Sequence, residues 1–408
     1  MFPCKTGSAH TFMKLFPLIL GLHTMNIGIV CYPTFGGSGV VATELGKALA
    51  KKGHAVHFIT SHWPIRLDHF TENVFYHEVN VSDYPLFEFP PYESALASKI
   101  VDVARFHHLD ILHVHYAIPH ASSGVFARQI LQRQYGIHLP IITTLHGTDI
   151  TLVGADPSFS PVVAYSIGES DGVTAVSDFL RDLTLKTMDI TTEIRVIPNF
   201  VDLERFQKLD KSHFRKLLAP EGEKVLMHTS NFRKVKRIED CIHIFHRVRA
   251  HMPCKLVMVG DGPERINAEA LCRELHLCND IRFLGKQQSV EELLAVSDLF
   301  LMPSGSESFG LAALEAMACG VPVLSSDTGG LPELNVDGVT GYIRPVGDVE
   351  GMATAAINLL LDASKLQAFS AQAVAHAARF DIHTLLPMYE DYYAEVIESS
   401  RKKRISIA

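Results

Sequence analysis

The chain has 408 residues, of which 47% are hydrophobic and 20% are charged, and its formal net charge is −8. This length predicts two or three domains with large apolar cores, and the acidic balance argues against a nucleic-acid partner. The seven cysteines are scattered and include no C-x-x-C pair, which argues against a zinc site or a disulfide scaffold and favours the reducing cytoplasm.

The two ends of the chain differ from the rest in composition. An apolar run over residues 12–22 carries Lys14 and follows Lys5, weakly like a signal peptide, but it is too short to span a bilayer. We therefore interpret residues 1–24 as an N-terminal extension rather than a working signal. The basic tail, residues 401–404, follows an amphipathic pattern and is interpreted as a solvated end, so neither nucleic acid nor a stable membrane anchor is expected.

Residues 25–200 predict a first doubly wound α/β half. An apolar strand over residues 25–31, a helix over 40–51 that ends at Gly53, and a strand over 55–60 form a βαβ opening. The glycine-rich turn between strand and helix lacks the G-x-G-x-x-G spacing of dinucleotide sites, although it offers backbone N–H groups and a hydroxyl. It is formed by Gly36, Gly37, Ser38 and Gly39.

The segment after this opening predicts surface excursions and then further strands. Residues 61–95 contain four prolines and are expected to be irregular, followed by a helix to about residue 107. A buried strand over 111–115 carries His113 and His115 on one face. These two residues are either core histidines or half of a metal site. His120 lies beyond the carboxyl end of that strand, where open α/β sheets bind ligands, and Thr148 follows the next strand, 140–145, in the same way.

Residues 201–380 predict a second half with the same alternation of strands and helices. A strand over 224–229 leads into a loop with Arg233, Lys234, Lys236 and Arg237, which is either a solvated face or an anion site. A strand over 255–259 ends in a G-D-G-P turn, and a strand over 281–284 precedes Gly285 and Lys286. Three helices close the chain at about 348–362, 364–378 and 383–399, and the last, within residues 381–408, is expected to return to the first domain.

The most informative stretch is residues 303–316, between an apolar strand over 299–302 and a helix that begins near Leu311. Ser306 and Ser308 are predicted to cap this helix, and Gly310 allows a ligand to approach the backbone. The free N–H groups of the first turn favour a phosphate, while Glu307 and Glu315 favour hydroxyl groups. Phosphate and hydroxyls together indicate a nucleotide sugar, although acidic residues near a helix start also occur for the helix dipole alone.

These motifs resemble the retaining family 4 glycosyltransferases of the GT-B fold over about residues 25–400. The resemblance rests on the E-x7-E pattern of Glu307 and Glu315, the Gly36–Gly39 loop, Pro198-Asn199 and the G-D-G-P turn. It implies two Rossmann-like domains facing across a cleft, with the acceptor on the first and the nucleotide sugar on the second.

Further segments resemble those family members that transfer N-acetylglucosamine from UDP-N-acetylglucosamine to L-malate in bacillithiol biosynthesis. They are MNIGIVCYPTFGGSGVVATELG, HVHYAIPHA, TTLHGTDIT and SNFRKVKR. One departure concerns the basic loop: many family 4 enzymes have an arginine five residues before the loop lysine, where this chain has Asn231, so the phosphate role is carried to Arg233 and Lys236.

The resemblance also implies a role for each site residue and no cofactor or metal. Glu307 would bind a sugar hydroxyl, Glu315 the ribose, and the Gly285-Lys286 region the uracil. No D-x-D pair is present to hold a metal between phosphates. The implied catalytic set is Glu307, His120, Arg233 and Lys236, and the implied substrate-binding set is Gly36, Gly37, Ser38, Gly39, Thr148, Asn231, Gly285, Lys286, Ser308, Phe309, Gly310, Leu311 and Glu315.

Three alternatives remain open at this stage. One is a family member with a different acceptor, such as a lipid, inositol or a growing glycan, although no exposed basic-apolar helix is evident in the first domain for a lipid. Another is a protein that binds nucleotide sugars without catalysis. Such a protein would be expected to lose Glu307 or the basic loop, and both are intact. A nicotinamide dehydrogenase is the weakest of the three alternatives, because the G-x-G-x-x-G motif and the acidic residue that follows it are missing. Separately, a homo-oligomer is compatible with the sequence.

Overall fold

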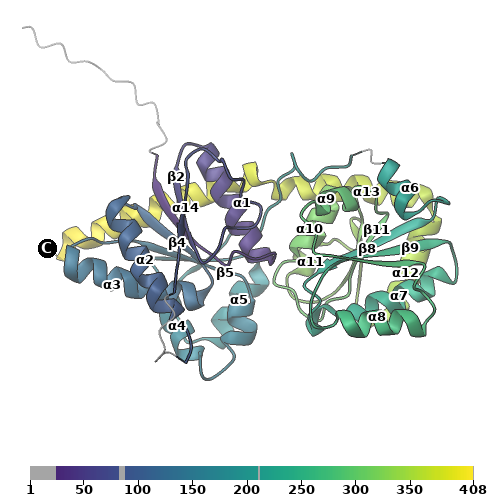
Figure 1. Cartoon of the computed structure of the whole chain (residues 1–408), viewed down its shortest axis with the longest axis horizontal. Coiled ribbons are helices and arrows are strands. Elements are labelled where there is room, and N and C mark those ends of the chain that lie inside the picture. Colours follow the sequence, from purple (N-terminus) through teal and green to yellow (C-terminus); the bar gives the residue numbers. More distant parts are fainter. Residues whose placement is uncertain (1–23, 82–87, 210–211, 408) are drawn as a thin grey trace, which may run out of the picture.

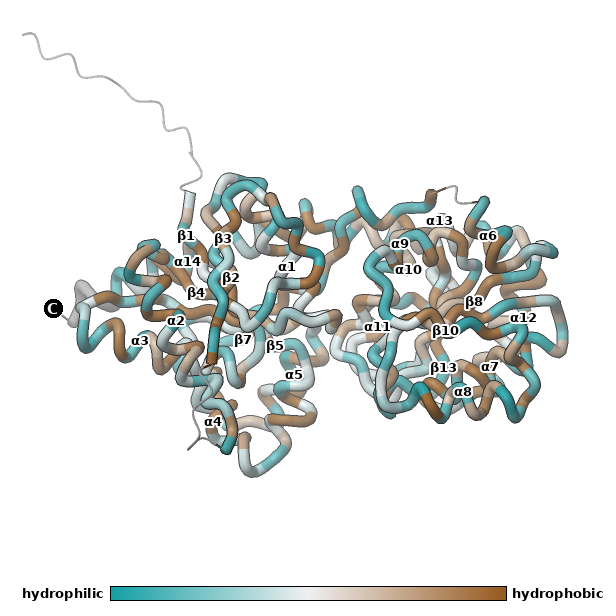
Figure 2. The backbone as a smooth tube through the Cα atoms, viewed as in Figure 1, coloured by the Kyte–Doolittle hydropathy of each residue, from teal (hydrophilic) through white to brown (hydrophobic). Residues whose placement is uncertain are grey.

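The computed structural model describes residues 24–81, 88–209 and 212–407; most of the N-terminal extension interpreted above lies outside these residues. The chain forms two α/β lobes placed side by side (Figure 1). Each lobe has one parallel β-sheet covered by helices on both faces. Figure 2 shows the hydrophobic stretches concentrated in the strands and the hydrophilic ones on outer loops. The predicted α/β, GT-B-like class is confirmed.

The first sheet has seven strands in the order β3-β2-β1-β4-β5-β6-β7. Its neighbouring strands pair in parallel throughout. The elements of this lobe are β1 (Asn26–Val30), α1 (Gly37–Lys51), β2 (Ala55–Thr60), β3 (Val74–Glu78), α2 (Tyr92–Phe106), β4 (Ile111–His115), η1 (Ala117–Ala121), α3 (Ser122–Tyr135), β5 (Ile141–Leu145), η2 (Asp149–Val153), α4 (Ser160–Gly168), β6 (Gly172–Ala175), α5 (Asp178–Thr187) and β7 (Ile194–Val196).

The second sheet has six strands in the order β10-β9-β8-β11-β12-β13. The remaining elements are α6 (Ser212–Leu218), β8 (Lys224–Ser230), η3 (Lys234–Lys236), α7 (Ile238–Arg249), β9 (Cys254–Gly260), α8 (Arg265–Glu274), β10 (Ile281–Gly285), α9 (Val290–Leu294), β11 (Leu299–Met302), α10 (Leu311–Ala318), β12 (Val323–Ser326), α11 (Leu331–Leu334), β13 (Gly341–Arg344), α12 (Val349–Leu361), α13 (Ala363–Ala377), η4 (Ala378–Phe380) and α14 (Ile382–Ile407).

The prediction that residues 61–95 are irregular is wrong in part, because β3 lies within them at the edge of the first sheet. This strand reads Val-Phe-Tyr-His-Glu and is only half-buried. It therefore lacks the apolar alternation that marks a strand in a sequence. The predicted end of the last helix near residue 399 also needs correction, since α14 continues through the basic residues to Ile407. Arg401 and Lys402 are exposed there, as expected for a solvated end.

The last helix packs on the first lobe, although the segment before it belongs to the second (Figure 1). The hydroxyl of Tyr393 hydrogen-bonds His113 at 2.7 Å, and that of Tyr392 accepts from the backbone N–H of Val173 at 3.0 Å. Two segments thus cross between the lobes. They touch where Val201 donates to the carbonyl of Phe380 and accepts from the N–H of Ile382, each at 2.9 Å.

Candidate active site

Both sheets direct their strand ends toward the junction of the lobes. In each sheet the strand order reverses once, between β1 and β4 in the first and between β8 and β11 in the second. Loops that follow the strands flanking such a reversal lie beside a crevice, where doubly wound sheets bind ligands. The four loops in question carry the Gly36–Gly39 turn, His120, the basic loop and the E-x7-E stretch.

The basic loop after β8 is shaped by two close backbone approaches. A Cβ at Gly260 would lie 1.8 Å from the carbonyl oxygen of Ser230, and one at Gly262 would lie 2.1 Å from that of Asn231. The G-D-G-P turn therefore packs directly under the loop. Phe232 anchors the loop as a fully buried side chain with φ of 39°, while Asn231 and Arg233 on either side of it are exposed. The predicted anion-site cations thus lie on a fixed support.

The helix start after β11 is uncapped by any side chain, so the prediction of Ser306 and Ser308 as caps is wrong. Gly310 occupies the cap position with φ of 98°, a conformation that glycine adopts without strain. Ser308 instead presents its backbone carbonyl to the Ser177 hydroxyl of the first lobe, at 2.6 Å. Without a capping side chain, the N–H groups at Leu311 and Ala312 keep their capacity for a ligand.

The glycines of the T-G-G turn hold the Glu307 loop in place. A Cβ at Gly329 would lie 1.8 Å from the carbonyl oxygen of Glu307, and one at Gly330 would lie 2.3 Å from that of Ser308. The Gly330 N–H also donates to the Glu307 carbonyl at 2.9 Å. These contacts explain why glycines follow β12, and they fix the backbone from which the Glu307 side chain extends.

Lys236 and Glu307 form an ion pair between the basic loop and the E-x7-E loop. The Lys236 Nζ lies 2.5 Å from Glu307 Oε1, and both side chains are largely buried. The same oxygen accepts a hydrogen bond from the Ser304 hydroxyl at 2.8 Å. Two residues that are 71 positions apart in the chain are therefore brought together, with their charges next to the uncapped start of α10.

Glu315 lies one turn into α10 and pairs with a residue of the first lobe. Arg66 Nη1 donates to Glu315 Oε1 at 3.0 Å, and both side chains are mostly buried. Arg66 comes from the segment after β2, which carried no site prediction. The carboxylate expected to bind ribose hydroxyls is thus occupied by a guanidinium in this structure.

The glycine turn of the first lobe meets α10 directly. Helix α1 begins at Gly37, and a Cβ at this residue would lie 3.7 Å from the side chain of Leu311. A Cβ at Gly39 would lie 2.4 Å from the carbonyl oxygen of Tyr32, so the turn can only be this tight with glycine there. The two helix N-termini consequently approach the junction from opposite sides.

Tyr116 links the predicted acceptor residues and was missed from the sequence. It follows β4 with φ of 87°, and the side chains of Ser38 and Thr148 lie near its hydroxyl. Burial raises the pKa of Tyr116, while the neighbouring Ser38 and Thr148 side chains and the charge of Arg233 across the junction oppose that shift. Its position directly after a strand's carboxyl end was the available signal.

His120 is fully buried in η1 and has one nitrogen without a partner. Its Nδ1 donates to the carbonyl of His115 at 2.5 Å, which leaves Nε2 as an unprotonated acceptor that has no hydrogen-bond partner. Burial lowers the pKa of His120 to about 4. Its ring centroid lies 4.5 Å from that of Tyr32, at the glycine turn. The side chain therefore offers a neutral acceptor at the first lobe's strand ends.

Asp149, which was not singled out from the sequence, holds together the loops that carry these groups. Its carboxylate accepts hydrogen bonds from the backbone N–H groups of Gly147, His146 and Ala117, at 2.8, 3.2 and 3.4 Å. Burial nevertheless raises its pKa to about 6. One carboxylate thereby ties the end of β5 to the end of β4.

The open question about His113 and His115 resolves in favour of core histidines. His113 bonds Tyr393 and the Thr144 hydroxyl, each at 2.7 Å, and His115 bonds His146 at 2.8 Å. Burial lowers the pKa of His113 to about 3. These rings support the sheet rather than converge on a metal.

The lobes close on one another around this site. Glu333 accepts from the backbone N–H groups of Asp178 and Phe179, at 3.0 and 2.7 Å, at the start of α5. The Lys286 ammonium lies 5.9 Å from the ring centroid of Phe35, so the Gly285-Lys286 turn reaches the first lobe as well. A single apolar cluster also joins the lobes, including Ile150 and Val176 on one side and Phe309 and Leu331 on the other.

Two family descriptions together match most of the chain. "Glycosyltransferase Family 4" matches residues 35–205, and "Glycosyl transferases group 1" matches residues 210–376. The chain is 45% identical to the N-acetyl-alpha-D-glucosaminyl L-malate synthase of Bacillus anthracis, over 93% of this chain and all of that protein. The chain belongs to the family 4 glycosyltransferases. This glycosyltransferase is also 26% identical to the D-inositol 3-phosphate glycosyltransferase 2 of Catenulispora acidiphila, over 95% and 96% of the two chains.

Solved structures show the same fold for this glycosyltransferase. Sucrose-phosphate synthase from Thermosynechococcus elongatus superposes with a TM-score of 0.77 at 20% identity, over 92% of this chain and all of that one. HepE of Anabaena, solved in complex with UDP and glucose, gives a TM-score of 0.77 at 21% identity, over 91% and 99%. In the described part of the chain, no helix is long and apolar enough to cross a bilayer.

Proposed function

We propose that this glycosyltransferase moves N-acetylglucosamine from UDP-N-acetylglucosamine to the hydroxyl of L-malate, with retention of the anomeric configuration. The observation that carries the proposal is the 45% identity to the Bacillus anthracis synthase over the full length of that protein. The product would be N-acetyl-alpha-D-glucosaminyl L-malate, the first intermediate of bacillithiol biosynthesis. We place the reaction in the cytoplasm, since reducing conditions fit the free cysteines of the described residues.

The second lobe provides the donor site in this proposal. The N–H groups at the start of α10, together with Lys236 and Arg233, would bind the diphosphate. Glu307 would accept a hydrogen bond from a sugar hydroxyl, with Lys236 moving from Glu307 to the phosphate as the donor enters. Glu315 would exchange Arg66 for the ribose hydroxyls, and the Gly285-Lys286 turn would contact the uracil.

Charge stabilisation on the departing UDP is the main catalytic task in this mechanism. The acceptor attacks the anomeric carbon on the face from which UDP leaves, the bond to the phosphate oxygen breaks, and the phosphate takes the acceptor's proton. A well-placed cation contributes about 3 kcal/mol to such a step, by analogy with a single oxyanion donor. Because Arg233 and Lys236 supply this charge and no D-x-D pair is present, we propose that the reaction needs no metal.

The first lobe provides the acceptor site. L-Malate carries two carboxylates, which suit the start of α1 at Ser38 and Gly39 and the hydroxyls of Thr148 and Tyr116. Support comes from the position of Tyr116 near both Ser38 and Thr148 and from the nearby charge of Arg233. His120 Nε2 would accept a hydrogen bond from a hydroxyl of the sugar or the acceptor.

The test is UDP release by the purified full chain with UDP-N-acetylglucosamine and EDTA, with and without L-malate. We expect malate-dependent release that EDTA does not reduce. Lys236→Ala should lower kcat at least a hundredfold, which corresponds to about 3 kcal/mol of lost stabilisation. Lys234→Ala is the matched control, since Lys234 is exposed on the same short helix and should leave kcat within twofold of wild type.

Two results would contradict parts of the proposal. Release that ignores malate but responds to D-inositol 3-phosphate would replace the acceptor and leave the donor site standing. Release that EDTA abolishes and Mg²⁺ restores would overturn metal independence. Equal losses in Lys236→Ala and Lys234→Ala would show that the general charge of the loop matters, rather than the pair with Glu307.

A further inference from the structure

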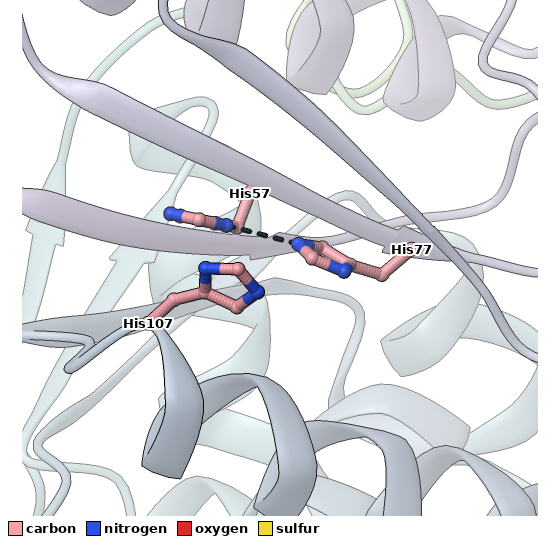
Figure 3. Close-up of side chains that lie close together, drawn as sticks. All are labelled: His57, His77 and His107. Carbon is pink, nitrogen blue, oxygen red and sulfur yellow. Dashed lines mark hydrogen bonds between the residues drawn. The ribbon is translucent and has the colours of Figure 1, made fainter.

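Three histidines gather on the first lobe, at the sheet edge formed by β2 and β3. His57 lies on β2 and His77 on β3, and both side chains project from the same face of the sheet. His107 directly follows α2, which covers that face. In Figure 3 the three imidazoles face one another across a small space. The cluster brings together residues separated by up to 50 positions, and the reaction proposed above uses none of them.

The distances between these nitrogens are close to those of a metal site. His57 Nδ1 lies 2.9 Å from His77 Nε2, and one nitrogen from each of the three rings lies within 4.8 Å of the others. Zn²⁺ bonds to imidazole nitrogen at 2.0–2.1 Å, so tetrahedral ligands of one ion are about 3.3 Å apart. His57 and His77 would separate by a few tenths of an ångström, and the exposed His107 would turn inward.

The electrostatics keep two of the ligands neutral and available. Burial lowers the pKa of His57 to about 4, and that of His77 to about 4 as well, with the neighbouring imidazoles adding to both shifts and Lys99 to that of His77. Neutral imidazole is the form that binds metals. His107 sits at the C-terminal end of a helix, where the backbone carbonyls favour a cation.

We propose that His57, His77 and His107 bind one Zn²⁺ ion, with solvent at the fourth position. Three imidazoles without a carboxylate among them suit zinc over Mg²⁺ or Ca²⁺, which prefer oxygen ligands. The ion would link edge strand β3 to β2 and to α2. It lies outside the nucleotide-sugar site, so this structural role is separate from the metal independence proposed for the reaction.

The test is a Zn²⁺ titration of the untagged, chelator-stripped full chain against a chromogenic chelator. Cys272 and Cys278 have sulfur atoms 3.7 Å apart and Cys278 is exposed, so a Cys278→Ser background removes a competing site. We expect one Zn²⁺ per chain, no response to Mg²⁺, and binding at least tenfold weaker in His107→Ala and His77→Gln. His246→Ala is the matched control, because His246 is an exposed helical histidine in the second lobe and should bind as the parent does.

A second readout separates a metal site from a stack of hydrogen-bonded rings. The chain has a single tryptophan, Trp63, whose ring centroid lies 5.0 Å from that of Tyr76, next to His77. Zn²⁺ should raise Tm and change Trp63 fluorescence in the parent but not in His107→Ala. The proposal is overturned if the parent binds no Zn²⁺, or if His107→Ala and His77→Gln bind it as tightly as the parent. Should His77→Gln fail to fold, the exposed His107→Ala still decides.

Discussion

At the scale of single residues, the candidate site consists of side chains whose partners lie far away in the sequence. Lys236 and Glu307 could be chosen as candidates because they stand in a loop and a motif with recognisable spacing. Their direct pairing could not be predicted from the sequence. The same holds for the pair of Arg66 and Glu315, which are 249 positions apart. Asp149 and Tyr116 were not predicted for the same reason. The backbone N–H groups around Asp149 and the hydroxyls near Tyr116 come close to these side chains only in the folded chain.

Tyr116 gives a prediction at this scale. Replacing it by Phe removes a hydroxyl that lies near Ser38 and Thr148 but keeps the ring in place. A hydrogen bond to a charged group is worth about 1.5–3 kcal/mol, so we expect KM for L-malate to rise at least tenfold. KM for UDP-N-acetylglucosamine should stay within twofold, as measured by initial rates of UDP release. Tyr165→Phe, at an exposed tyrosine of α4, serves as the control. A rise in the donor KM instead would move Tyr116 to the donor side.

At the scale of elements, strands buried on both faces were predictable, whereas two of the four edge strands, β3 and β13, were not. The strand over residues 111–115 was placed correctly to the residue because five consecutive buried positions leave no competing period. Edge strand β3 was missed because half-exposed positions show no clear alternation. The helix α10 was predicted, but its start was assigned to serine caps, since sequence alone does not show that Ser308 faces the other lobe.

The support beneath the basic loop leads to a second prediction. A methyl group at Gly262 would lie 2.1 Å from a backbone oxygen of Asn231, so Gly262→Ala must displace the loop. We expect a loss of about 1–3 kcal/mol in the free energy of unfolding, the usual range for overpacking, together with most of the activity. Gly168→Ala is the matched control, because nothing lies within 4 Å of a Cβ there. Chemical denaturation and UDP release measure the two effects; unchanged stability in Gly262→Ala would show that the turn is not tight in solution.

At the scale of the whole molecule, buried neutral histidines should make the fold sensitive to mild acid. Burial lowers the pKa of His120 and of His228 to about 4, from an ordinary value near 6.5. Between these values the unfolded chain binds more protons, so stability falls as pH decreases from 6.5 toward 4. Each histidine should cost about 2 kcal/mol at pH 5 relative to pH 7. Asp149, whose pKa is raised to about 6, acts in the opposite direction and offsets about 1 kcal/mol.

We therefore expect the free energy of unfolding to decrease between pH 7 and pH 5 in urea titrations. His228→Asn tests the assignment, because an amide can donate to the Leu301 carbonyl as Nδ1 does, at 2.8 Å in the structure, but does not titrate. This variant should lose about 2 kcal/mol less than the wild type over the same interval. A wild-type stability that is flat from pH 7 to pH 5 would contradict the prediction.

The double crossing between the lobes has a mechanical consequence. A single connecting segment would let the lobes rotate about several axes. Two connecting segments, hydrogen-bonded to each other at Val201 and Phe380, restrict the relative rotation of the lobes. Opening of the lobes is then reduced largely to rotation about one axis, and closing brings the same loops together each time. Few relative orientations are lost when substrate draws the lobes together, so closure carries a small entropic cost.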